Sequence, residues 1–411
     1  MSWDRFGRRK EFVAGIFLLA MAISHAAMVF TVLPRLRRGY QDFTIFYAAG
    51  KMIRNGQSAS LYDLRAQYRT QNEFAPDVPI RQAALPYNHP PFEALLFVPF
   101  TFIEYLPAYG IWTVINLAML ASSLTLLRKH FTDIRNLSPA LLSLAAAGFF
   151  PIAMAIIQGQ DSILLLLITV LAMAAAAEAR DVSAGAVLAL GLFKFHLIIP
   201  LVLIVAIKRP RLLVGFVPVA LALVGVSVAL VGWHGALDYV RFVLHVEGNA
   251  AGGVVWVFDM PNLRGLIAVM AGAFAGSVWS TLLTVAGSVA VVLVAVWSVR
   301  EAGNTVQRTF ALATVATMLI GYHTMPYDLS LLLPVALFFF AAAGHTRATG
   351  DRADVLLLLL LFLTPLYVFL ELDMLRLGWF ALLLIWLFWR LARAATPISP
   401  QVKQAILAGS L

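Results

Sequence analysis

Ionisable side chains inside long apolar segments are the residues of this sequence that could do chemistry. Lys194 and His196 lie in GLFKFHLIIP, His323 and Asp328 lie in GYHTMPYDLSLL, and Asp161 ends the short motif QGQD. Charged groups are costly within a membrane span, so each is a functional candidate by default. Structural alternatives stay open: an internally paired or snorkelling Lys194, a hydrogen-bonded packing role for His323, and a helix start at Asp328.

Asp42 is a different kind of candidate because it precedes an amphipathic segment. In DFTIFYAAGKMIR, three-and-four spacing places one set of residues on a common helical face: Phe43, Phe46, Tyr47, Gly50 and Ile53. The segment predicts an interfacial helix that lies on the membrane, and residues 61–74 predict a second one. Asp42 could be the N-cap of the first helix or a general base facing a cavity between loop and spans.

Tyr87, Asn88 and His89 precede Pro90 and Pro91, where the chain enters the next apolar segment. Paired prolines at such a place are typical of a helix start. The polar residues before them could form a second wall of the same cavity.

The composition places these candidates in a membrane protein. Of 411 residues, 61% are apolar, 12% are charged and none is cysteine, whereas a soluble domain is about half apolar and about a quarter charged. The absence of cysteine excludes disulfides, thiolate metal sites and cysteine nucleophiles. The net charge of +9 comes from basic residues placed between apolar segments, which fits a cytoplasmic Lys/Arg bias and anionic lipids and argues against nucleic acid as a partner.

The apolar segments predict an all-α, polytopic membrane protein of about twelve spans, with residues 1–395 as a single domain and 396–411 as a short cytoplasmic tail. The first span covers Phe12–Leu33 and starts in the cytoplasm. The others are 91–105, 107–127, 137–157, 159–177, 182–207, 212–233, 277–299, 306–322, 326–343, 354–370 and 377–395. On this count Arg128–Lys129 falls outside, against the positive-inside rule. Segment 182–207, with its central Lys194 and His196, is a candidate broken helix that would change the count.

Two polar segments are predicted on the outer side: a first periplasmic loop over 34–90 and a second segment over 234–276. The first is the longest polar stretch of the chain. It holds four acids, Asp42, Asp63, Glu73 and Asp77, against eight basic residues: Arg35, Arg37, Arg38, Lys51, Arg54, Arg65, Arg69 and Arg81. An excess of positive charge on the outer side breaks the usual trend, so we expect a site that holds an anion.

Motifs of soluble enzymes are missing from the sequence. It contains no Walker loop, HExxH or GxSxG, and no GxGxxG after a strand. The sequence therefore argues against a cytosolic nucleotide-driven activity. Two other classes stay open: a secondary transporter with Lys194, His196 and Asp328 as a midplane relay, and a non-catalytic scaffold of an envelope-polysaccharide system.

An ordered set of motifs resembles one known family. DFTIFYAAGKMIRNGQSASLYD and YNHPPFEALLFVPF are followed by GQDSILLLL, GLFKFHLIIPL and PYDLSLLLP. Together they resemble glycosyltransferase family 87, whose members belong to the GT-C superfamily and are related to mycobacterial polyprenyl-phosphate-mannose-dependent mannosyltransferases. The resemblance covers about 42–334. The chain departs from the family at Phe195–His196, since the residue after the lysine is commonly proline.

The resemblance implies an inverting glycosyltransferase of a bacterial inner membrane, with its site facing the periplasm. The donor would be a polyprenyl-phosphate sugar (mannose, another hexose or a pentose), the acceptor a lipid or glycan, and no metal or other cofactor would be required. Asp42 matches the catalytic base. Cations that suit the leaving phosphate are Lys194, Arg264 and Arg38. The predicted sugar and acceptor pocket comprises His323, His89, Asn88, Tyr87, His196, Asp328, Gln160 and Tyr47.

Overall fold

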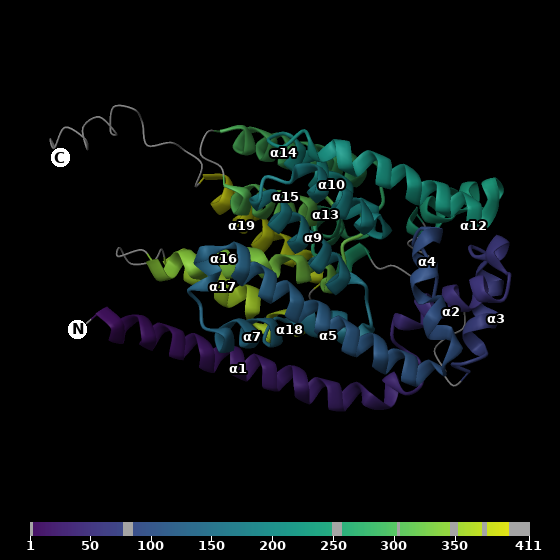
Figure 1. Cartoon of the computed structure of the whole chain (residues 1–411), viewed down its shortest axis with the longest axis horizontal. Helices are drawn as coiled ribbons and strands as arrows, with labels where there is room; N and C mark the ends of the chain where they lie inside the picture. The colour runs from purple at the N-terminus through teal and green to yellow at the C-terminus, as the bar shows by residue number, and fades with distance from the viewer. Residues whose placement is uncertain are drawn as a thin grey trace.

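The computed structural model describes residues 3–76, 85–248, 257–301, 305–345, 352–371 and 376–393, and all regular elements in these ranges are helical. Figure 1 shows a bundle whose helices run mainly along its long axis, with α2 (Phe43–Arg54), α3 (Leu64–Asn72) and α4 (Pro91–Phe97) gathered at one end. This end is called the loop end below. The first helix, α1 (Trp3–Leu36), begins at the opposite end, called the start end. The predicted tail at 396–411 lies outside the described residues.

Five helical segments in the described part of the chain are long and apolar enough to cross a membrane: Glu11–Leu36 of α1, α5 (Tyr105–His130), Asp181–Ala206, Leu212–Leu244 of α12 (Leu212–Gly248) and α14 (Val278–Arg300). Two bent pairs raise this number to seven if each pair is one span. They are α7 (Pro139–Ala147) with α8 (Phe150–Gln158), and α17 (Arg352–Phe362) with α18 (Thr364–Glu371). The all-α, polytopic prediction is confirmed, and the exact number of spans stays a prediction.

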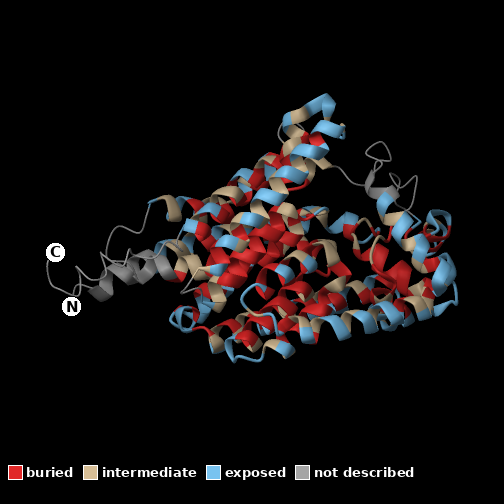
Figure 2. Ribbon diagram, turned by 90° about the horizontal axis from the view of Figure 1, so that it is seen from above, coloured by how far each residue is buried: buried red, intermediate tan, exposed pale blue. Residues whose placement is uncertain are grey.

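The outer helices expose apolar side chains along their length, as expected of helices that contact lipid. On α1, Phe12, Ile16, Ile23 and Phe30 are all more than half exposed. Figure 2 shows the buried residues concentrated in the interior of the bundle. Two polar contacts of His25 hold α1 to this interior: its ring nitrogens lie 2.8 Å from the carbonyl oxygen of Ala147 and 2.7 Å from Oγ1 of Thr364.

Shorter helices fill the interior and complete the bundle. The α-helices are α6 (Thr132–Arg135), α9 (Ser162–Ala177), α10 (Asp181–Ala189), α11 (Phe195–Ala206), α13 (Leu263–Ala271), α15 (Val306–Ile320), α16 (Leu333–His345) and α19 (Ala381–Arg393). The 3-10 turns are η1 (Ser58–Ser60), η2 (Val98–Phe102), η3 (Leu190–Lys194), η5 (Val257–Asp259), η6 (Gly272–Phe274), η7 (Pro326–Leu332) and η8 (Leu377–Phe380). Residues 309–319 of α15 are all buried, so this helix is part of the core.

The structure corrects the assignment of 91–105 as a span. These residues form two short elements, α4 and η2, which pack on α2 at the loop end. The approach is so close that a Cβ on Gly50 would lie 2.7 Å from the carbonyl carbon of Phe97. Their apolar side chains therefore bury against the other helices of the loop end, and seven residues of α-helix are too short to cross a bilayer.

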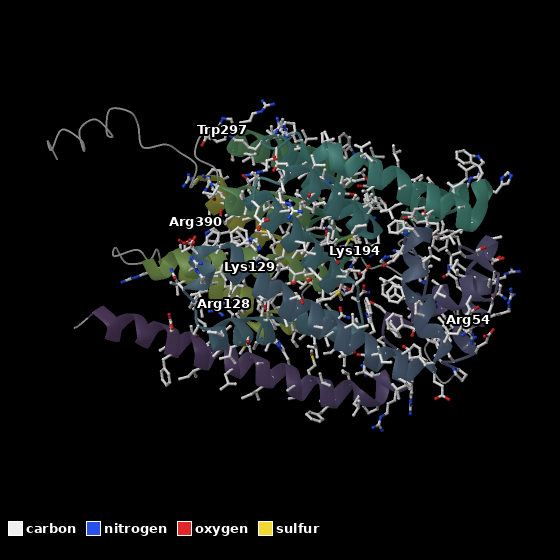
Figure 3. The ribbon with its side chains drawn as sticks, viewed as in Figure 1. Arg54, Arg128, Lys129, Lys194, Trp297 and Arg390 are labelled. Atoms are coloured by element: carbon white, nitrogen blue, oxygen red, sulfur yellow. The ribbon has the colours of Figure 1, made fainter. Side chains whose placement is uncertain are left out.

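This correction removes the conflict at Arg128–Lys129. Because α4 and η2 do not span, α5 is the first helix to return from the loop end toward the start end. Figure 3 shows Arg128 and Lys129 toward the same end as Arg390, with Arg54 at the opposite end. Arg128 and Lys129 thus share a side with the start of α1, as the positive-inside rule requires.

The two predicted outer segments differ in detail from expectation. Residues 43–50 of α2 are all buried, so α2 packs inside the protein and does not lie on the membrane with one face free. The chain stays helical after 234, because α12 continues past a kink at Gly232, where φ is 73°. Beyond the kink the rings of Tyr239 and Phe242 pack against Tyr62, at centroid distances of 5.0 and 5.6 Å. The second segment therefore touches the first loop.

Candidate active site

A cavity of about 140 Å³ lies where the loop end meets the membrane helices. Its lining combines Asp42, Ile45, Leu85, Pro86, Asn88 and His89 of the first loop with Gln160, Phe193, Lys194, Phe195, His196, Val243, Tyr322, His323, Met325, Tyr327 and Asp328 from later elements. Eight of the twelve predicted site residues line it: Asp42, Asn88, His89, Gln160, Lys194, His196, His323 and Asp328. A concave site with a few convergent polar groups is the usual form of a small-molecule site.

Asp42 occupies the N-cap position of α2, yet its side chain caps nothing. It makes no capping hydrogen bond. Instead, Oδ2 of Asp42 accepts a hydrogen bond of 2.7 Å from the side-chain amide of Gln160. The backbone N–H of Asp42 donates to Oε1 of Gln158 over 3.2 Å. One carboxylate oxygen is thus fixed by the turn after α8, while Oδ1 accepts no hydrogen bond from any residue that the structure describes.

The surroundings of Asp42 make its carboxylate a stronger base than an exposed aspartate. Burial raises the pKa of Asp42 above its ordinary value, because a low-dielectric environment disfavours the charged form. The hydrogen bond from Gln160 lowers the pKa, as do the nearby Lys194, His89 and His323, and these effects are smaller than that of burial. A carboxylate with a raised pKa accepts a proton from a hydroxyl more readily.

A left-handed turn at Gly159 brings Gln160 to Asp42. Gly159 ends α8 with φ at 63°, a region that residues with a Cβ rarely adopt. Its carbonyl oxygen accepts a hydrogen bond of 2.9 Å from the indole of Trp112. A Cβ at this position would lie 2.8 Å from Cβ of Phe43, the residue after Asp42. Both the conformation and the space therefore require glycine.

We expect Gly159→Ala to lower both stability and activity. A left-handed backbone costs a residue with a Cβ about 1–2 kcal/mol, and the contact with Phe43 adds to that and displaces Asp42. Gly56→Ala is the matched control, because Gly56 has φ of 70° with nothing within 4 Å of its Cβ position. Thermal unfolding in detergent should show the larger loss for Gly159→Ala, and sugar transfer should fall in this variant alone. Equal losses in the two variants would contradict the packing argument.

Lys194 is held inside the protein by two carboxylates. Its Nζ lies 2.8 Å from Oδ1 of Asp161 and 2.5 Å from Oδ1 of Asp328, and it donates to Oγ of Ser162 over 2.8 Å. Lys194, Asp161 and Asp328 are each no more than 3% exposed. The internally paired arrangement is therefore present, although Lys194 and Asp328 also line the cavity.

The chain geometry explains how these groups meet. Helices α10 and α11 are interrupted by η3, which ends at Lys194 with non-helical backbone angles. This confirms the break expected within 182–207. Asp328 lies in η7 and has two roles, because its Oδ2 also accepts a hydrogen bond of 2.9 Å from the backbone N–H of Met325. It both caps the first turn of η7, which begins at Pro326, and binds Lys194.

His89 belongs to a second polar group beside this cluster. Its Nδ1 lies 2.8 Å from Oε2 of Glu93 and 3.5 Å from Oδ2 of Asp161. Burial lowers the pKa of His89 to about 4, against the raising effect of Asp161. The imidazole is therefore neutral near pH 7. His89, Glu93 and Asp161 have the ligand types and the closeness that a divalent cation needs, and the charge-pair contacts among these groups and with Lys194 also account for their arrangement.

Four predicted site residues do not line the cavity. Tyr47 donates to the carbonyl oxygen of Ile103 over 2.7 Å, and the hydroxyl of Tyr87 donates to the carbonyl oxygen of Pro90 over 3.0 Å, so both are packing residues of the loop end. Arg38 is exposed. Arg264 lies behind the wall, with its guanidinium 4.1 Å from the ring centroid of Tyr322 and a hydrogen bond of 2.9 Å to the carbonyl oxygen of that residue.

The model of glycosyltransferase family 87 matches residues 87–326, which is more than half of the chain. The chain belongs to glycosyltransferase family 87. It is therefore a glycosyltransferase, and its apolar helices place it in a membrane as a multi-pass protein. A search of curated proteins gives no match.

The family match includes most of the cavity wall but leaves out Asp42 and Asp328. The geometry around Asp42, and not the family match, is therefore the basis for assigning this residue a role in the family 87 glycosyltransferase.

Sequence reasoning missed several polar residues beside the site. Glu93 and Ser162 are buried next to His89 and Lys194, and Tyr327 has its ring centroid 4.9 Å from Nζ of Lys194. An acid in the first turn of an apolar segment, four residues after a histidine, is a signal that could have found Glu93. Ser162 and Tyr327 carry no comparable signal, because their neighbours come from distant parts of the chain.

Proposed function

We propose that this chain is an inverting glycosyltransferase that moves a sugar from a polyprenyl-phosphate donor to a lipid or glycan acceptor. The proposal rests on the position of Asp42. It faces the cavity at the junction of loop and membrane helices, with one oxygen fixed by Gln160. A substrate with a hydrocarbon tail can keep the tail among lipid-facing helices while its phosphate and sugar reach this junction.

In the proposed reaction, the acceptor hydroxyl attacks the anomeric carbon from the face opposite the phosphate. The new C–O bond forms as the bond between the anomeric carbon and the phosphate oxygen breaks, and Asp42 takes the hydroxyl proton. Polyprenyl phosphate leaves with the bonding electron pair. One base is enough because inversion needs no covalent enzyme intermediate.

The leaving phosphate gains negative charge, so hydrogen-bond donors and cations directed at it lower the barrier. Lys194 lines the cavity, but with Asp161 and Asp328 ionised its cluster carries a net negative charge. We therefore assign Lys194 to orienting the phosphate. Arg264, stacked on the lining residue Tyr322, and the exposed Arg38 are proposed to supply attracting charge from outside the cavity lining. His196 and His323, whose ring centroids are 6.0 Å apart, supply donors in the wall.

The neutral imidazole of His89 and the amide of Asn88 are proposed to bind sugar hydroxyls, because both can donate and accept hydrogen bonds. The positive-inside rule supports an outer position for this site. Arg128, Lys129 and Arg390 lie toward the start end, opposite Arg54 of the loop end. With the start end in the cytoplasm of a bacterial cell, the cavity faces the periplasm.

A donor panel tests the proposal. Purified protein in lipid is incubated with polyprenyl-phosphate sugars, and in parallel with nucleotide sugars, together with a membrane lipid extract as acceptor. We expect a new glycolipid, identified by mass spectrometry, with polyprenyl-phosphate donors only and with the same yield after EDTA. Transfer from nucleotide sugars would overturn the donor class. Loss of activity with EDTA and recovery with a divalent cation would assign a metal to His89, Glu93 and Asp161.

The hydrogen bond from Gln160 makes a prediction about pH dependence. It lowers the pKa of Asp42, so its removal in Gln160→Met raises that pKa further and protonates the base over a wider acidic range. We expect the acidic limb of kcat/KM to move to higher pH. The plateau rate should fall about tenfold, because Oδ2 of Asp42 is then no longer held in position and the gain in basicity does not offset the lost orientation. Gln158→Met is the control, because Gln158 accepts only from the backbone of Asp42. An unmoved limb in Gln160→Met would refute this role.

A further inference from the structure

A second cavity, of about 470 Å³, lies around the last turns of α5 and shares no lining residue with the proposed active site. Its wall consists of Ala121, Leu124, Thr125, Arg128, Lys129, Arg135, Pro139, Leu142 and Ser143. These residues come from α5, from α6 and from the first turns of α7. The cavity therefore lies at the start end of the bundle, where Figure 3 shows Arg128 and Lys129.

The wall contains three cations and no acid. Among the described residues, Arg128, Lys129 and Arg135 form no ion pair, and the buried Nε of Arg128 has no hydrogen-bond partner. The guanidinium of Arg135 makes a long hydrogen bond, in which its Nη2 donates to Oγ1 of Thr132 over 3.5 Å. An unsatisfied buried donor on a cation has a cost, which an anion in the cavity would remove.

Further features of the wall suit an anion. The nine-residue helix α7 begins at Pro139 with Ser138 as its N-cap, so the positive end of its dipole is at the cavity. The hydroxyl of Ser143 adds a hydrogen-bond donor, whereas that of Thr125 donates to the carbonyl oxygen of Ala121 over 2.8 Å. Three cations, one hydroxyl donor and a helix N-terminus match the oxygens of a phosphate group.

The position of the cavity distinguishes a lipid from a free phosphate. Ala121, Thr125 and Ser143 are exposed, so the cavity opens on the outer surface of α5. From that opening the exposed apolar residues Leu117 and Val114 continue along α5 toward the loop end. A charged pocket that continues into a lipid-facing apolar surface fits a headgroup with its acyl chains attached.

We propose that this cavity binds the phosphate headgroup of an anionic phospholipid. Arg128 and Arg135 hold the phosphate oxygens, and the acyl chains lie along the exposed face of α5. The site is separate from the catalytic cavity and goes beyond the proposed function, since it needs neither the donor nor the acceptor. It would anchor the α5–α7 corner of the bundle to acidic lipid at the membrane surface.

Native mass spectrometry of the full chain in detergent tests the site, with dioleoyl-phosphatidylglycerol and dioleoyl-phosphatidylcholine offered at equal concentrations. We expect the parent protein to retain phosphatidylglycerol selectively. Each surface cation contributes about a fivefold factor to binding of an acidic lipid, so Arg128→Gln with Arg135→Gln should weaken retention about 25-fold. The control pair Arg65→Gln with Arg69→Gln removes the same charge from exposed residues of α3, and it should retain the lipid as the parent does.

Other outcomes would overturn the proposal. Equal retention of the two lipids by the parent, or equal losses in the two double variants, would show a non-specific charge effect. Displacement of the lipid by excess inorganic phosphate, with phosphate bound in its place, would make the ligand a free anion. If the double variant does not fold, Ala121→Trp keeps all three cations and blocks the opening. It should lose phosphatidylglycerol, and full retention would refute the cavity as the site.

Discussion

Asp42→Asn should abolish sugar transfer while the protein folds normally. Asparagine has the shape of aspartate and can still accept the hydrogen bond that Gln160 donates to Oδ2, but its amide does not take a proton from the acceptor hydroxyl. Loss of a general base typically costs a factor of about 10² to 10⁴ in rate. We therefore expect kcat to fall by about that factor, with little change in KM for the donor, measured as glycolipid formed from a polyprenyl-phosphate sugar.

Asp63→Asn is the matched control for this experiment. Asp63 is an aspartate of the same loop, so the same Asp-to-Asn change can be made there. Its side chain caps α3 by accepting a hydrogen bond of 2.9 Å from the backbone N–H of Ala66. Asparagine is an equally good cap, so transfer and stability should stay at the parent level. Full transfer by a well-folded Asp42→Asn protein would show that the base is another group of the cavity.

The sequence located Asp42 but could not show what its side chain does. An aspartate before an amphipathic segment is typical of an N-cap, and the structure places Asp42 at that position without the capping bond. The decisive partner, Gln160, lies 118 residues later in the chain. Contacts at such a separation depend on the packing of α8 against the loop end and leave no local pattern in the sequence.

The buried charged residues could likewise be predicted from the sequence, but their contacts could not. Apolar surroundings were enough to single out Lys194, Asp161 and Asp328, because a charged group inside a span is rare. Their mutual pairing could not be derived, since Lys194 and Asp328 are 134 residues apart. The same limit applies to Arg264, whose type suits a phosphate but whose side chain lies behind Tyr322.

Hydropathy predicted the membrane class correctly and overestimated one span for a physical reason. Apolar composition reports that a segment avoids water, whether its neighbours are lipids or protein. Residues 91–105 avoid water by packing on α2 at the loop end. The charge pattern contained the correction, because a non-spanning 91–105 is what places Arg128–Lys129 on the same side as the start of α1.

The cluster around Lys194 makes the second large prediction, which concerns stability. Lys194→Met would leave Asp161 and Asp328 buried without their shared cation, at 0% and 1% exposure. Removing one partner from a buried ion pair typically costs about 3–5 kcal/mol. We expect a loss of this size in the free energy of unfolding, measured by denaturation in detergent or lipid, and a matching drop in the yield of folded protein.

Two further variants distinguish the loss of the buried ion pair from a general loss of charge. Lys51→Met removes a cation whose partner, Glu73, is 2.8 Å away and half exposed, and a surface pair of this kind is worth about 0–1 kcal/mol. Asp328→Asn leaves Lys194 paired with Asp161 and removes the surplus negative charge, so it should cost less than Lys194→Met. Combined with Lys194→Met, it should recover part of the lost stability, because only one buried carboxylate then lacks its cation. Additive losses in the double variant would mean that the two side chains act independently, which the 2.5 Å contact between them argues against.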